Sequence, residues 1–178
     1  MPQFSISYKI DDAEINPEEV TDWYEIGGGM CVKYGDIILT RSNAKDDDGY
    51  IGNWVFNEIL ALISRIPRLM RGEKCIVDIE ELFTGFSMEP KNNQIYFSVI
   101  PMHLEPKIAE EAINMYPRSA KACPIPAKLF YNGVIDLGHR FLNDIKKMYI
   151  NFNKKEIENY RELLKDAEEL VDEYNKTH

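Results

Sequence analysis

Residues 132–176 carry the pattern that most restricts what this chain can fold into. Their apolar side chains recur at steps of three and four, which is the spacing of one face of an α-helix. A first run comprises Val134, Leu137, Phe141, Ile145 and Met148, and a second comprises Ile157, Tyr160, Leu164, Ala167, Val171 and Tyr174, with Leu163 and Leu170 beside it. Residues Asn151 to Asn153 separate the two runs, so the pattern predicts a C-terminal helical hairpin over 132–176. The stripe must be buried against this chain or against a second copy.

Alternation with a period of two predicts strands earlier in the chain. Phe4, Ile6, Tyr8 and Ile10 alternate with polar side chains, and Cys75, Val77 and Ile79 do the same. Residues 83–88 and 95–100 flank a turn-forming stretch, Glu89 to Gln94, which predicts a β-hairpin. Strands together with amphipathic helices predict an α+β fold, an antiparallel sheet with helices packed on it.

Between these segments lie two sequence features that interrupt regular secondary structure, a proline and a run of glycines. Apolar residues recur at helical spacing from Trp54 to Ile66, after a capping Asn53, and Pro67 is predicted to end or kink that helix near Ile66. Gly27 to Gly29 precede strand-like residues rather than a helix, so a bulge or turn is favoured over a phosphate-binding loop.

Residues 101–131 contain five prolines and give no clear pattern. Lys107 to Met115 is predicted as a short helix. Pro124 and Pro126 favour extended backbone, because the residue before a proline avoids the helical region.

The chain length of 178 residues fits one domain, and we expect a single domain over 1–178. Within it, residues 1–50 form an acidic N-terminal portion and 132–176 a helical C-terminal portion. No stretch approaches 18 uninterrupted apolar residues, and the first residues do not resemble a secretory signal. Three cysteines without metal-ligand spacing do not suggest disulfides, so we expect a reducing cytoplasm.

Negative charge is concentrated at the start of the chain. The formal net charge is −9, and residues 1–50 hold eleven Asp or Glu against four Lys or Arg. An acidic surface attracts basic proteins and repels nucleic-acid phosphates and anionic membranes. The charge therefore predicts a basic protein partner and neither nucleic acid nor membrane.

Motifs that would carry catalysis or hold a cofactor are not found. Asp46 to Asp48 resemble the start of a calcium loop, but counting from Asp47 places Gly49 and Ile51 where oxygen ligands are needed. We therefore expect no metal and no cofactor. Paired bases at 139–140, 146–147 and 154–155 are interleaved with acids, which is typical of a solvated helix surface.

Small size, acidity, many aromatic side chains and missing catalytic motifs together resemble the immunity proteins of bacterial polymorphic and contact-dependent toxin systems. Members of those families bind a cognate toxin, often a basic nuclease, and block its active site. The resemblance is one of general type over the whole chain and assigns no residue. It implies a non-enzymatic protein that neutralises a basic toxin by direct binding.

The predicted partner-binding surface combines acids with two aromatic anchors, Trp23 and Tyr24. The full set is Asp11, Asp12, Glu14, Glu18, Glu19, Asp22, Trp23, Tyr24, Asp46, Asp47 and Asp48. One alternative is an enzyme that assembles a site from Cys123, His103 or His139. Another is a structural or adaptor subunit that forms a homodimer through its C-terminal helix.

Overall fold

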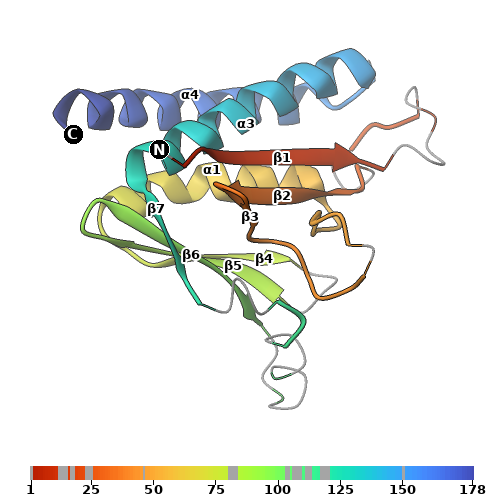
Figure 1. Cartoon of the computed structure of the whole chain (residues 1–178). Helices are drawn as coiled ribbons and strands as arrows, with labels where there is room; N and C mark the ends of the chain where they lie inside the picture. Colours follow the sequence, from red (N-terminus) through yellow and green to blue (C-terminus); the bar gives the residue numbers. More distant parts are fainter. Residues whose placement is uncertain are drawn as a thin grey trace.

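The computed structural model describes residues 2–11, 16, 19–22, 26–45, 47–79, 84–102, 105, 110, 114–116, 121–149 and 151–178. Over these residues the chain forms two antiparallel sheets and three long helices, so the predicted α+β class is confirmed (Figure 1). The strands belong to two separate sheets, whereas the sequence patterns predicted one sheet. No helix among the described residues is long and apolar enough to cross a membrane.

The first sheet contains β1 (Phe4–Ile10), β2 (Gly28–Tyr34) and β3 (Ile37–Ile38) in that order. The predicted alternation in β1 is confirmed, because Phe4 and Ile6 are buried while Ser5 is exposed. Gly28 and Gly29 are the first two residues of β2. An added Cβ on Gly29 would lie 3.1 Å from the backbone of Ile51, so its lack of a side chain lets β2 approach residues 51–53, where the Gly28 N–H donates to the Asn53 carbonyl at 3.1 Å.

The second sheet has the order β4-β5-β6-β7. It contains β4 (Cys75–Ile79), β5 (Thr84–Lys91), β6 (Gln94–Pro101) and β7 (Cys123–Pro126). The predicted hairpin is present, but its strands run to Lys91 and from Gln94. Asn92 and Asn93 alone form the turn, with φ of 52° and 59°, the left-handed values that a two-residue hairpin turn requires.

Helix α1 (Val55–Met70) lies at the centre of the fold. It contacts both sheets and both C-terminal helices. Of the two predicted effects of Pro67, an end or a kink, the end is wrong, since α1 continues to Met70. Leu69, two residues after the proline, is 1% exposed. Burial of the Leu69 side chain favours extension of the helix beyond Pro67. It offsets part of the free energy lost because proline has no N–H to donate a helical hydrogen bond.

Helices α3 (Ala127–Met148) and α4 (Lys154–Thr177) form the predicted C-terminal hairpin. Helix α3 begins five residues before residue 132, directly after β7, whose prolines are extended as predicted. Asn153 caps α4, its side-chain oxygen accepting from the Lys155 N–H at 3.0 Å. Lys107 to Met115 falls mostly outside the described residues, which leaves that predicted helix untested.

The stripe of α4 packs on the same chain. Tyr160, Leu164, Ala167 and Val171 are buried against α1 and α3. Phe56 of α1 meets Phe152 and Tyr160 at ring-centroid distances of 5.4 and 5.5 Å. This aromatic cluster packs the start of α1 against the start of α4, and a groove lies between the two helices there.

Candidate binding groove between helices α1 and α4

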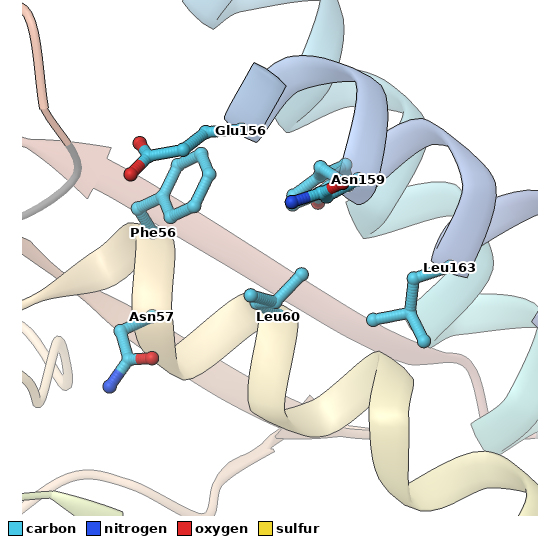
Figure 2. Close-up of a pocket in the computed structure, with 7 residues that line it drawn as sticks. Phe56, Asn57, Leu60, Glu156, Asn159 and Leu163 are labelled. Carbon is cyan, nitrogen blue, oxygen red and sulfur yellow. The ribbon is translucent and has the colours of Figure 1, made fainter. Parts of the chain in front are cut away.

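A groove with a cavity volume of about 310 Å³ opens between α1 and the first turns of α4 (Figure 2). Helix α1 contributes Phe56, Asn57 and Leu60, and α4 contributes Glu156, Asn159, Tyr160 and Leu163. The spacing within each helix is three or four residues, so each set shares one helix face. One face of α1 and one face of α4 therefore form the walls.

The floor of the groove is aromatic and its walls are aliphatic. Phe56 and Tyr160 are 4% and 1% exposed, and the Tyr160 hydroxyl donates to the Gly138 carbonyl at 3.2 Å. Leu60 and Leu163 are only half-buried, and Figure 2 shows them pointing towards one another across the opening. These two leucines offer apolar surface that a bound partner could cover.

The groove combines apolar contacts with hydrogen-bonding groups. Burial raises the pKa of Tyr160 above its usual range, so its phenol stays neutral. The lining residues include no Cys or His. Asn57, Asn159 and Glu156 can exchange hydrogen bonds with a ligand at the rim, where Figure 2 places Glu156 beside Phe56.

The acidic segment Glu19 to Asp22 lies beside the turn that precedes α4. The Thr21 carbonyl accepts from the Asn153 N–H at 3.0 Å, which fixes the segment to the turn before α4. Asp11 and Glu19 are exposed, and Glu19 accepts from the Asn16 amide at 3.2 Å. The structure therefore places two of the predicted acids, Glu19 and Asp22, close to the start of α4.

Asp47 and Asp48 have local structural partners. The Asp47 carboxylate accepts from the backbone N–H groups of Ser42 and Gly49 at 2.6 and 2.5 Å, and Asp48 pairs with Lys9 at 3.0 Å. Partial burial opposes ionisation of Asp47, but these hydrogen bonds outweigh it and lower its pKa. The hydrogen bond from the Tyr50 N–H and the contact with Lys9 lower the pKa of Asp48.

Six of the predicted binding residues fall outside the described part of the chain, and their placement is not tested. They are Asp12, Glu14, Glu18, Trp23, Tyr24 and Asp46. Among the residues that the structure does describe, no three His, Cys, Asp or Glu side chains are grouped so that they could hold a metal ion.

The cysteines do not have the surroundings of activated nucleophiles. Burial raises the pKa of Cys31, Cys75 and Cys123, and no histidine is among the groups that act on them. His139 instead pairs with Glu168 at 3.1 Å on the surface of α3 and α4. His103 lies outside the described residues.

The groove residues were not predicted as a site. Leu60 and Leu163 were assigned only to apolar helix faces. One feature of the sequence could have indicated the groove. Leu163 lies beside the main apolar stripe of α4, so the apolar face of α4 is wider than one neighbouring helix can cover.

Comparison of the chain with protein-family models, with curated proteins and with solved structures finds no match.

Proposed function

We propose that this protein is a non-enzymatic binding protein that holds a basic protein partner at the groove between α1 and α4. An immunity protein that neutralises a basic toxin is the particular form that the acidity and small size favour. The observation that carries the proposal is an aliphatic groove, open at Leu60 and Leu163, in a molecule whose acidic segment Glu19 to Asp22 is fixed to the turn that precedes α4.

The two parts of this surface would contribute differently. Apolar side chains that become buried at the centre of an interface supply most of the affinity. Exposed acids mainly raise the association rate of a basic partner and exclude other acidic proteins. Asp11 and Glu19 are exposed acids that fit the second role, and Asp22 beside them is half-buried.

The test begins with the product of the gene adjacent to this one, purified and mixed with this protein. The association rate is measured between about 50 and about 500 mM salt, where screening of exposed charges increases strongly. We expect a fall of at least about tenfold over that range. A rate that does not depend on salt, or absence of a complex, would contradict the proposal.

A pair of variants tests the groove itself. Leu163→Lys places a cation in the groove opposite a basic partner, whereas Leu170→Lys places the same charge elsewhere on α4, at a residue that is 36% exposed. We expect the first variant to weaken binding about tenfold or more and the second less than about threefold. Equal effects would show that only overall charge matters. Thermal unfolding of both variants controls for folding.

A further inference from the structure

A second pocket, of about 290 Å³, lies at the turn that connects α3 to α4. Its α4 residues, Lys154, Ile157, Glu158 and Arg161, follow helical spacing and lie on the side of α4 opposite to the groove. Lys146 and Tyr149 come from the end of α3, and Phe152 comes from the turn. The pocket is therefore distinct from the proposed partner-binding groove.

Positive charge converges on this pocket in a protein whose net charge is −9. Lys146, Lys154 and Arg161 line it, against one acid, Glu158. Within the described part of the chain, none of the three cations forms an ion pair or a side-chain hydrogen bond. Lys154 precedes Glu158 by four residues, which is the less favourable order for an ion pair on a helix.

The base of the pocket is formed by two buried aromatic side chains. Tyr149 and Phe152 are 4% and 5% exposed, and the Phe152 ring packs at a tilt against that of Phe56 with centroids 5.4 Å apart. Aromatic side chains surrounded by cations suit a ligand with an apolar body and an anionic group, because each part of the ligand then meets a complementary surface.

We propose that this pocket binds a small organic anion, an apolar ring or branched chain that carries a carboxylate, sulfonate or phosphate. The volume sets the size, since it lies at the lower end of the range of about 300 to 1,000 Å³ for ligand pockets. The anionic group lies among Lys146, Lys154 and Arg161, and the apolar body packs on Tyr149 and Phe152.

Naphthalene-1-carboxylate is a suitable probe, and NMR titration of the ¹⁵N-labelled protein gives both the affinity and the place of binding. Two comparison ligands separate the contributions of charge and apolar body: naphthalene-1-methanol is neutral with the same rings, and acetate is an anion without them. We expect chemical-shift changes centred on residues 146–161 and weaker binding of both comparison ligands, by at least about fivefold.

Neighbouring lysines supply matched variants. Lys154→Gln and Arg161→Gln remove a cation from the pocket, whereas Lys155→Gln and Lys147→Gln remove one from the same helices outside it. We expect the first pair to weaken binding of the probe about threefold to tenfold and the second pair less than about twofold. All four positions are exposed, so the fold should tolerate each change.

Three outcomes would overturn this inference. Equal weakening by both pairs of variants would indicate long-range attraction without a site. Equal binding of the neutral ligand would remove the role of the cations. Tighter binding of an acidic hexapeptide than of the probe would assign the pocket to a segment of another protein rather than to a small anion.

Discussion

At the scale of single residues, Gly28 joins three segments that are distant in sequence. Its φ of +147° is one that residues with side chains rarely adopt, and an added Cβ would lie 2.2 Å from the Lys9 carbonyl oxygen of β1. On its other side, its N–H donates to Asn53 at 3.1 Å. The glycine run in the sequence indicated special backbone, but these contacts depend on residues 9 and 53 and could not be predicted from it.

We expect Gly28→Ala to lower the free energy of unfolding by about 2–5 kcal/mol. Backbone strain accounts for roughly 1–2 kcal/mol, and displacement of β1 accounts for the rest. Gly72→Ala is the matched control, because Gly72 has a φ of +83° and nothing within 4 Å of the added Cβ. It should lose only about 1 kcal/mol. Urea unfolding measures both, and equal losses would contradict the close-contact argument.

At the scale of elements, periodicity predicted the segments that have one buried and one solvated face. It succeeded for β1, for β4 and for α4, whose buried positions follow the predicted stripe. It did not predict that α1 continues past Pro67 or that α3 begins at Ala127, because tertiary burial of Leu69, Ala127 and Phe130 outweighs the local signal there.

Helix α4 gives a prediction at this scale. Leu164 is 1% exposed and fills the space above Gly138 of α3, where an added Cβ would lie 2.7 Å from it. Leu164→Ala should therefore lower the free energy of unfolding by about 2–5 kcal/mol through the cavity that it leaves. Leu170→Ala, on the same helix but 36% exposed, should change it by no more than about 0.5 kcal/mol.

Thermal unfolding at several protein concentrations completes the test of α4. Because Leu164 is buried within one chain, the midpoint of the Leu164→Ala variant should not depend on concentration. A concentration-dependent midpoint would instead show that the stripe stabilises a dimer, the alternative that the sequence left open.

At the scale of the whole molecule, the fold class could be predicted but the arrangement could not. Strand-like and helical patterns indicate antiparallel sheet and packed helices, yet nothing in them separates β1–β3 from β4–β7 into two sheets. The groove could not be predicted either, because it forms where Phe56 to Leu60 face Glu156 to Leu163, which lie about a hundred residues later in the sequence. Sequence patterns report which face of an element is apolar, and not which other element covers it.

Burial of tyrosines across the whole fold predicts a loss of stability in alkali. Burial raises the pKa of Tyr116 to about 12 and is also the main reason that the pKa values of Tyr131 and Tyr160 are raised. For Tyr8, burial acts first and the hydrogen bond that its hydroxyl donates to Asp144 adds to it. In the unfolded chain these phenols ionise near their ordinary pKa of 10.0.

The sign of the effect follows from proton linkage. Above about pH 10 the unfolded chain loses protons that the folded chain keeps, so the free energy of unfolding falls as the pH rises through the folded pKa values. Below about pH 9 the tyrosines are protonated in both the folded and the unfolded chain, so their burial contributes fully to the free energy of unfolding. We therefore expect urea midpoints to be nearly constant from about pH 7 to 9 and to fall steadily above about pH 10.

Tyr8→Phe separates this effect from the titration of lysines. The variant lacks one phenol, so its stability at about pH 8 should be lower by roughly 1–2 kcal/mol, through the lost hydrogen bond to Asp144, while its decline above about pH 10 should be shallower than that of the unaltered protein. Phenolate absorbance, recorded during the same titration, should rise together with unfolding. If the absorbance rose fully while the urea midpoint stayed constant, the tyrosines would be ionising in the folded protein, and their burial could not be what links stability to pH.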